Sequence, residues 1–363
     1  MPERSSHPTI VIMAGGTGGH VFPALATADK LKHMGYTIHW LGTQRGIESR
    51  LVPAAGIDIS YLSISGVRGK GLAGWLSAPF KLAKAFMESA SVLKAIKPVC
   101  VLGMGGFAAA PGGVAAWWLK IPLVIHEQNA VAGSTNSLLA PLAKRVLQAF
   151  AGAFKGRDKG QVVGNPIREA IELVREQREH SAESETKHVL VLGGSQGALA
   201  LNGIVPGALK ELSSEFSLKI RHQAGEKGVN AVREHYQGLA DAEAFAFIDD
   251  MAAAYAWADV VICRSGALTV SELAAAGLPA VLVPFPHAID DHQTANANIL
   301  VKAGAALLMP QEEMSERTLG RVLGGLFRTP GKLSKMSDCA RAMAVLGSAD
   351  KVAAVCQEVA LEH

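Results

Sequence analysis

Glycine-rich turns that could cradle phosphate groups follow strand-like segments of the chain. The first, GGTGGH at residues 15–20, comes directly after the apolar segment TIVIM (9–13) and precedes a helix-like stretch. Backbone amides in such a turn, together with the N-terminus of the next helix, can hold an anion. The turn is neither a dinucleotide fingerprint nor a Walker A motif, because no GxGxxG aligns on it and no GKS or GKT follows. Tight packing of a strand against a helix would explain the same glycines.

Two further glycine turns also follow strand-like segments. They are GMGG at residues 103–106 and GGSQG at residues 193–197. Several such turns in one chain are typical of a protein that holds two phosphorylated ligands, or one large one. The structural alternative is that all three turns only allow close packing of strands against helices.

Two histidine-containing segments could do acid–base chemistry. His20 ends the first glycine turn, where a neutral imidazole could accept a proton from a hydroxyl group or could simply cap the helix. The segment HEQN (126–129) follows another strand but lacks the second histidine of HExxH, so it does not predict a zinc site. We interpret HEQN as a polar loop that faces a ligand.

The second half of the chain carries candidate contacts for a nucleotide. Residues 265–272 (SGALTVSE) follow the strand-like VVICR (260–264), which would place backbone amides and Glu272 at a helix start. A carboxylate there could accept both hydroxyls of a ribose, or could merely be favoured by the helix dipole. Arg168 could clamp a phosphate or lie in a solvated hinge. Residues 284–293 hold no aspartate pair with the D-x-D spacing of metal-dependent sugar-nucleotide enzymes.

A basic and apolar stretch extends from Arg68 to Lys97. It holds six lysines and arginines and a single acid, Glu88. The spacing suits an amphipathic helix, which could rest on anionic lipid headgroups or pack on a sheet with its lysines in water. Trp117 and Trp118 could extend the same surface or belong to the core. The candidate membrane-facing residues are Leu72, Trp75, Leu76, Phe80, Lys81 and Lys84.

Strands that alternate with helices must position these residues. Eight short apolar segments read as strands: 9–13, 37–41, 99–103, 122–126, 188–193, 217–223, 260–264 and 280–284. Most of them are continuous apolar runs, which is typical of parallel strands that are buried on both faces. Because both halves begin with a strand and a glycine turn, the sequence predicts an α/β protein with two Rossmann-like, doubly wound, parallel-sheet domains. We place these domains at residues 1–164 and 165–345, facing each other across a cleft.

Composition excludes a disordered chain and shows that charge is unevenly distributed along the sequence. The 363 residues are 49% apolar and 18% charged, too apolar for a disordered chain. The net charge of +3 hides opposite halves: residues 1–165 hold 17 basic and 7 acidic side chains (+10), and residues 166–363 hold 18 and 25 (−7). A basic half favours an anionic membrane, a phosphorylated substrate or nucleic acid, and the absence of an RRM aromatic box disfavours nucleic acid.

Targeting signals and cysteines point to a reducing compartment. The N-terminal MPERSSHP is polar and shows no signal peptide, and the four cysteines contain no CxxC pair.

The uncharged run from Pro98 to Leu119 is long enough to cross a bilayer. Glycines and prolines interrupt it, so we predict a buried strand, turn and helix instead.

Six segments together resemble glycosyltransferase family 28, the N-acetylglucosamine transferases of peptidoglycan synthesis. They are GGTGGHVFPALA (15–26), GMGGF (103–107), HEQNAVAG (126–133), GNPIR (164–168), LGGSQGA (192–198) and RSGALTVSELAAAGLPAVLVPFPHAIDDHQ (264–293). The resemblance covers residues 9 to about 345. It implies a GT-B fold, a C-terminal helix at 346–363 that packs back on the first domain, and no metal or other cofactor.

The resemblance also implies a reaction and a location. N-acetylglucosamine would pass from UDP-N-acetylglucosamine, with inversion, to the C4 hydroxyl of the muramoyl sugar in undecaprenyl-pyrophosphoryl-MurNAc-pentapeptide (lipid I). The β-1,4-linked product would be lipid II. The enzyme would lie peripherally on the cytoplasmic face of the inner membrane, with its basic half on anionic lipid, and could join a cell-wall and division complex. No nucleic-acid partner is expected.

Site residues follow from the same resemblance. The donor sugar would be approached by Thr17, Gly18, Gly19, Asn129 and Gln293. The pyrophosphate would contact Arg168 and Ser195, and the uracil would contact Ile248. The phosphates and ribose would contact Ala267, Leu268, Thr269, Val270, Ser271 and Glu272. The acceptor pyrophosphate would lie on Gly15, Gly16, Gly103, Gly105 and Gly106. His20 is the expected general base, ahead of Glu127, which could instead orient it.

Two alternatives remain at the level of sequence. One is another GT-B enzyme, such as a diacylglycerol glycosyltransferase or a non-hydrolysing sugar-nucleotide epimerase. The other is a catalytically silent nucleotide-binding scaffold for a cell-wall complex, which the intact base and donor motifs disfavour.

Overall fold

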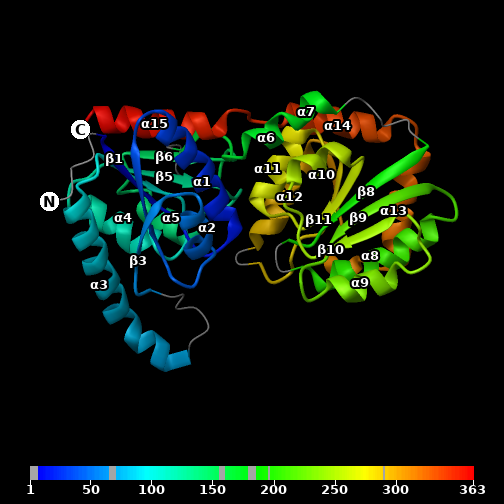
Figure 1. Cartoon of the computed structure of the whole chain (residues 1–363), viewed down its shortest axis with the longest axis horizontal. Helices are drawn as coiled ribbons and strands as arrows, with labels where there is room; N and C mark the ends of the chain where they lie inside the picture. The colour runs from blue at the N-terminus through cyan, green and yellow to red at the C-terminus, as the bar shows by residue number, and fades with distance from the viewer. Residues whose placement is uncertain (1–6, 65–70, 155–159, 179–184, 195–196, 289–290) are drawn as a thin grey trace. The chain divides into compact units, whose positions relative to one another are not determined.

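The computed structural model describes residues 7–64, 71–154, 160–178, 185–194, 197–288 and 291–363, except the side chains of 71–78 (Figure 1). The chain forms two compact units, which we call the first unit (1–168 with 347–363) and the second unit (169–346). Each unit is built on one parallel sheet that is covered by helices. The predicted α/β class with two doubly wound parallel sheets is confirmed.

The sheet of the first unit has seven strands in the order β3-β2-β1-β4-β5-β6-β7. The strands are β1 (Thr9–Met13), β2 (Thr37–Gly42), β3 (Asp58–Tyr61), β4 (Cys100–Gly103), β5 (Leu123–Glu127), β6 (Arg145–Gln148) and β7 (Gly160–Val162). The order along the sheet reverses between β1 and β4, which pair in parallel with Met13 opposite Gly103. Open α/β sheets bind ligands beyond the carboxyl ends of their strands at such a switch point.

Among the described residues, six helices cover this sheet. They are α1 (Gly18–His33), α2 (Glu48–Ala54), α3 (Gly71–Ile96), α4 (Ala109–Trp118), α5 (Ser134–Leu139) and the C-terminal α15 (Ser348–Leu361). Figure 1 shows α15 beside α1, and Val352, Cys356 and Val359 are buried in the same apolar cluster as Ile10 and Ile12. The C-terminal helix is therefore part of the core of the first unit.

The sheet of the second unit has six parallel strands in the order β10-β9-β8-β11-β12-β13. The strands are β8 (Thr186–Leu192), β9 (Ser217–Gln223), β10 (Ala242–Phe245), β11 (Val260–Cys263), β12 (Ala280–Leu282) and β13 (Ala306–Leu308). The helices are α6 (Glu169–Glu172), α7 (Val174–Gln177), α8 (Leu199–Leu212), α9 (Val229–His235), α10 (Met251–Trp257), α11 (Ala267–Ala276), α12 (His292–Lys302), α13 (Glu316–Arg328) and α14 (Lys332–Ala342). Its switch point lies between β8 and β11, which repeats the arrangement of the first unit.

All eight strands predicted from the sequence are present, each within two residues of its expected bounds. Five further strands were not predicted, β3, β6, β7, β10 and β13, and they lie at or near sheet edges. The edge strands β3, β7 and β10 are only partly buried and lack the continuous apolar runs that identify central strands, whereas β13 is apolar but only three residues long. The run from Pro98 to Leu119 forms β4 and α4, as predicted. In the described part of the chain, no helix is both long and apolar enough to cross a membrane.

Candidate functional site

Two glycine turns meet at the switch point of the first unit. The turn after β1 and the turn after β4 pack backbone against backbone, since a Cβ added to Gly106 would lie 2.3 Å from the carbonyl oxygen of Gly15. Gly16, Gly105 and Gly106 also adopt positive φ angles between 85° and 96°. Such angles strain other residues, so the sequence needs glycine here for both conformation and close approach.

Glu48 supports the first turn from inside the protein. Its carboxylate is buried and accepts the Gly16 N–H at 3.0 Å, the Thr43 N–H at 3.0 Å and the Thr43 hydroxyl at 2.6 Å. Glu48 lies at the start of α2, and its carboxylate is engaged with this turn. In α1, the amides of Gly18 and Gly19 open the helix and have no carbonyl partner within it.

His20 lies in the first turn of α1, with its ring against the second glycine turn. A Cβ at Gly105 would come within 3.1 Å of the imidazole. The ring Nδ1 is 2.9 Å from Oε1 of Gln128, and α1 has no side-chain cap. The ring therefore bonds across the switch point and does not cap the helix.

Glu127 is fully engaged in holding the loop after β5. One of its oxygens accepts the backbone and side-chain N–H groups of Asn129 at 2.9 and 3.0 Å. The other accepts the Gly133 N–H at 3.1 Å and the Asn136 side chain at 2.9 Å. The side chain that shares a hydrogen bond with His20 is Gln128, while all four hydrogen bonds described for the Glu127 carboxylate go to Asn129, Gly133 and Asn136.

Three of the four HEQN side chains are internal. His126, Glu127 and Gln128 are at most 1% exposed, and only Asn129 is partly exposed. Burial lowers the pKa of His126 to about 4, so this imidazole is neutral near pH 7. Most of the segment is therefore a buried hydrogen-bond network at the end of β5, and Asn129 is its one partly exposed side chain.

Arg168 ends the first unit on its surface. Its guanidinium lies 5.9 Å from the ring of Phe22. Phe22 in turn covers Gly18, where an added Cβ would lie 3.0 Å from the ring. Arg168 thus lies near the beginning of α1, where positive charge and free amides would both favour an anion.

The switch point of the second unit also carries a glycine turn. Gly194 and Gly197 have φ angles of 80° and 76°, and a Cβ at Gly197 would lie 2.1 Å from the carbonyl oxygen of Ala224. Ser195 lies outside the described residues. Helix α8 begins at Leu199 without a side-chain cap, so its first amides have no protein acceptor within the helix.

Helix α11 starts directly after β11, on the other side of this switch point. Gly266 is its N-cap, so the residues predicted to meet phosphates, Ala267, Leu268 and Thr269, open the helix with their amides. Val270 and Ser271 follow. Glu272 is in the second turn, so the dipole at the helix start does not explain this acid. Its buried carboxylate accepts the hydroxyl of Tyr255 at 2.9 Å.

Other candidate donor contacts lie on loops of the second unit. Ile248 is partly buried after β10, and Gln293 lies in the first turn of α12. The Gln293 side-chain oxygen accepts the Phe285 N–H at 2.9 Å, so its amide nitrogen is the group left to reach a ligand. Arg264, for which the sequence predicted no role, donates to the carbonyl oxygens of Val283 and Pro284 and fixes the loop after β12.

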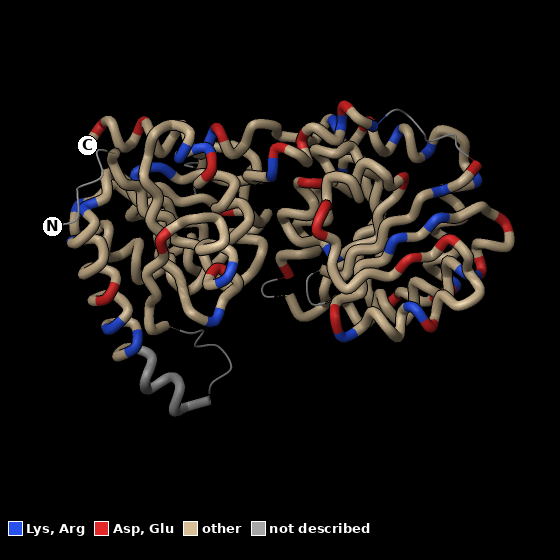
Figure 2. The backbone as a smooth tube through the Cα atoms, viewed as in Figure 1, with Lys and Arg blue, Asp and Glu red and all other residues tan. Residues whose placement is uncertain are grey.

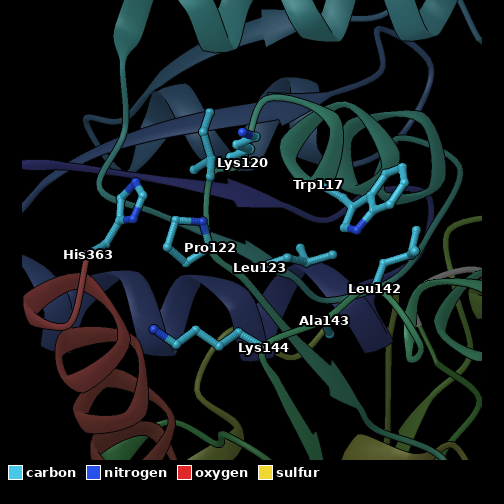
Figure 3. Close-up of a pocket in the computed structure, with 9 residues that line it drawn as sticks. Trp117, Lys120, Pro122, Leu123, Leu142, Ala143, Lys144 and His363 are labelled. Atoms are coloured by element: carbon cyan, nitrogen blue, oxygen red, sulfur yellow. The ribbon is translucent and has the colours of Figure 1, made fainter.

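A surface hollow in the first unit lies away from these residues. It has a volume of about 290 Å³ and is lined by Trp117, Lys120, Ile121, Pro122, Leu123, Leu142, Ala143, Lys144 and His363 (Figure 3). Leu123 begins β5, whereas the glycine turns follow strand ends, so the hollow is at the opposite edge of the parallel sheet. Among the described residues, no group of three or more His, Cys, Asp or Glu could hold a metal ion.

Two doubly wound parallel sheets, each with a glycine turn and an uncapped helix start at its switch point, define the GT-B class of α/β proteins. The chain belongs to glycosyltransferase family 28. The N-terminal domain of that family matches residues 10–148, and its C-terminal domain matches residues 188–352.

Relatives cover nearly the whole chain. The UDP-N-acetylglucosamine–N-acetylmuramyl-(pentapeptide) pyrophosphoryl-undecaprenol N-acetylglucosamine transferase of Methylococcus capsulatus is 53% identical over 352 residues, covering 97% of this chain and 98% of that protein. The crystal structure of Acinetobacter baumannii MurG has a TM-score of 0.82 at 40% identity, covering 97% and 99% of the two chains. A structure described as a putative UDP-N-acetylglucosamine 2-epimerase from Listeria monocytogenes has a TM-score of 0.70 at 15% identity over 99% and 98%, which shows a shared fold alone.

Proposed function

We propose that this chain transfers N-acetylglucosamine from UDP-N-acetylglucosamine to the muramoyl C4 hydroxyl of lipid I, with inversion, to give lipid II. The observation that carries the substrate assignment is the 53% identity, over nearly the full length, to a transferase named for this reaction. The glycine turns and uncapped helix starts at both switch points support it, because both substrates are diphosphates.

The donor would bind the second unit. Amides at the start of α11, with Ser195, would bind the diphosphate of UDP, and Glu272 would accept the ribose hydroxyls. Ile248 would contact uracil, and Gln293 would donate to the sugar. As the anomeric carbon–oxygen bond breaks, negative charge grows on UDP, and fixed amides and Arg168 stabilise it without reorganisation. This use of main-chain amides is the basis for our proposal that no metal takes part.

The acceptor would bind the first unit. The C4 oxygen would attack the anomeric carbon while His20 takes its proton, and UDP would leave from the opposite face. Gly18 and Gly19, which open α1, would approach the donor sugar with Thr17 and Asn129. The turns at Gly15–Gly16 and 103–106 would lie against the acceptor pyrophosphate. Since the Gly16 N–H is already donated to Glu48, the other amides of the turns would supply the donors.

A surface on α3 and α4 supports membrane association. Phe80 is 80% exposed and Met87 62%, and Trp117 and Trp118 are both more than half exposed, so the tryptophans are not core residues. Lysines such as Lys81 and Lys84 accompany them, with one acid on the described part of α3 (Figure 2). Exposed aromatics with lysines favour an anionic lipid surface. The side chains of Leu72, Trp75 and Leu76 lie outside the described residues.

The reaction can be tested with purified protein and radiolabelled UDP-N-acetylglucosamine. We expect label to appear in lipid II with lipid I as acceptor, and activity to persist in EDTA. Transfer to diacylglycerol, or epimerised nucleotide sugar without an acceptor, would replace our proposal by one of the alternative GT-B activities. Absence of any turnover would favour the scaffold.

A further inference from the structure

A line of hydrogen bonds joins His20 to the backbone carbonyl of Gly164 through Gln128 and His126. The distances are 2.9 Å from His20 Nδ1 to Gln128 Oε1, 3.2 Å from Gln128 Nε2 to His126 Nδ1, and 2.8 Å from His126 Nε2 to Gly164 O. His126 and Gln128 are buried, so water does not compete for these groups. We call this line the His20–Gly164 chain.

The carbonyl oxygen of Gly164 fixes the position of each proton along the His20–Gly164 chain. The Gly164 oxygen can only accept, so Nε2 of His126 must carry a hydrogen. Since burial keeps His126 neutral, with a pKa of about 4, its Nδ1 carries a lone pair and accepts a hydrogen bond.

The orientation of Gln128 is fixed twice. Its Nε2 lies 3.2 Å from His126 Nδ1 and 3.1 Å from the His126 carbonyl oxygen, and both of these atoms are acceptors. A flipped amide would place its oxygen against that carbonyl oxygen, leaving two buried acceptors in contact. The NH₂ group of Gln128 must therefore face His126, and its oxygen must face His20.

We propose that Gln128 and His126 are positioning residues that hold neutral His20 with its proton on Nδ1 and its lone pair on Nε2. The Gln128 oxygen can only accept, so the facing Nδ1 of His20 must donate. Among the residues that the structure describes, Nε2 of His20 has no hydrogen-bond partner, so it is the nitrogen open to a substrate hydroxyl. Free histidine in water prefers the opposite tautomer, with the proton on Nε2. The link to catalysis rests on the proposed role of His20 as base.

The tautomer can be measured without turnover. In the full chain with ¹⁵N-labelled histidine, the two imidazole nitrogens of neutral His20 give different chemical shifts when protonated and unprotonated, and His20→Gln identifies its signals. We expect Nδ1 to be protonated in the unmodified protein. A protonated Nε2 in neutral His20 would overturn the proposal, whatever the activity.

Variants of Gln128 separate positioning from general damage. Gln128→Leu should shift His20 toward Nε2 protonation and lower kcat at least about tenfold, with an unchanged KM for UDP-N-acetylglucosamine. Gln128→Glu keeps an oxygen that can accept from Nδ1, so it should retain the tautomer, but its second oxygen faces the two His126 acceptors, so the variant should be less stable to denaturant. Thr27→Val is the matched control, because it removes a buried hydrogen bond to Pro23 within the same helix and should leave the His20 signals unchanged.

The outcomes distinguish this inference from the proposed function. If Gln128→Leu leaves the His20 tautomer unchanged, the positioning role is wrong. If the tautomer behaves as expected but His20→Gln retains normal turnover, the tautomer control stands and the assignment of His20 as base fails.

Discussion

Gly16 donates its backbone N–H to the carboxylate of Glu48, 32 residues further along the chain, at 3.0 Å. Thr43 donates twice to the same carboxylate, so three donors converge on one buried group. These contacts fix the first glycine turn from inside the protein, and the Glu48 carboxylate does not occupy the amides that open α1.

Replacing Glu48 should therefore disturb the turn. Glu48→Gln places an NH₂ group against a backbone or side-chain donor, and we expect a loss of about 1–3 kcal/mol in the free energy of unfolding. The KM for lipid I should rise while the Kd of UDP is unchanged, since UDP binds the second unit in our proposal. Denaturant unfolding and steady-state kinetics test this. The exposed Glu234→Gln should change stability by less than about 0.5 kcal/mol. Equal effects of the two variants would refute a supporting role for Glu48.

His20→Ala should fold and bind UDP-N-acetylglucosamine but lose turnover. Removing a general base costs about 10²- to 10⁴-fold in kcat. Calorimetric titration with the donor checks binding, and the lipid II assay checks kcat. Normal turnover would remove His20 as the base.

Glu272→Ala should weaken UDP binding by about tenfold or more, because a charged acceptor of the ribose hydroxyls is lost. The affinities for UDP and 2′-deoxy-UDP test the contact with the ribose itself. The unmodified protein should bind UDP more tightly than 2′-deoxy-UDP, and the variant should bind the two equally. Tyr255→Phe removes only the hydroxyl that donates to Glu272 and should have a smaller effect. A preference for UDP that survives in Glu272→Ala would contradict the ribose assignment.

The α3–α4 surface should control membrane binding. Phe80→Ser combined with Trp117→Ser should lower partition onto anionic liposomes by about tenfold or more, since each aromatic ring loses roughly 1.5–3 kcal/mol of apolar transfer. The Kd of UDP should be unchanged. Met343→Ser alters an exposed apolar residue on the second unit and is the control. Unaltered sedimentation of the double variant with liposomes would show that this surface does not bind lipid.

Acid should destabilise the protein partly through His222. This buried imidazole lies between Tyr236 and Asn202, and burial lowers its pKa from 6.5 to about 3. The unfolded chain binds a proton below pH 6.5 while the folded protein does not until about pH 3, so stability falls as the pH drops through this window. The cost at pH 5 is about 2 kcal/mol. In His222→Gln, the free energy of unfolding should fall between pH 7 and pH 5 by about 2 kcal/mol less than in the unmodified protein. An equal fall in the two proteins would refute a contribution of His222 to acid destabilisation.

The sequence alone determined the central strands, the glycine turns that follow them and the two-domain α/β class. Buried parallel strands such as β1 and β11 are continuous apolar or β-branched runs, and a positive φ next to a close backbone contact requires glycine, so both leave local signals. Edge strands such as β7 leave no such signal.

Only the tertiary structure decided which polar side chains work together. Gln128 meets His20 across 108 residues, Glu48 meets Gly16 across 32, and Glu272 meets Tyr255 across 17. Glu127 and Gln128 are adjacent in the sequence, but the Gln128 side chain reaches His20 whereas the Glu127 carboxylate binds the loop at Asn129. Hydrogen-bond partners depend on which strand ends are adjacent, and strand order is a long-range property that no local spacing encodes.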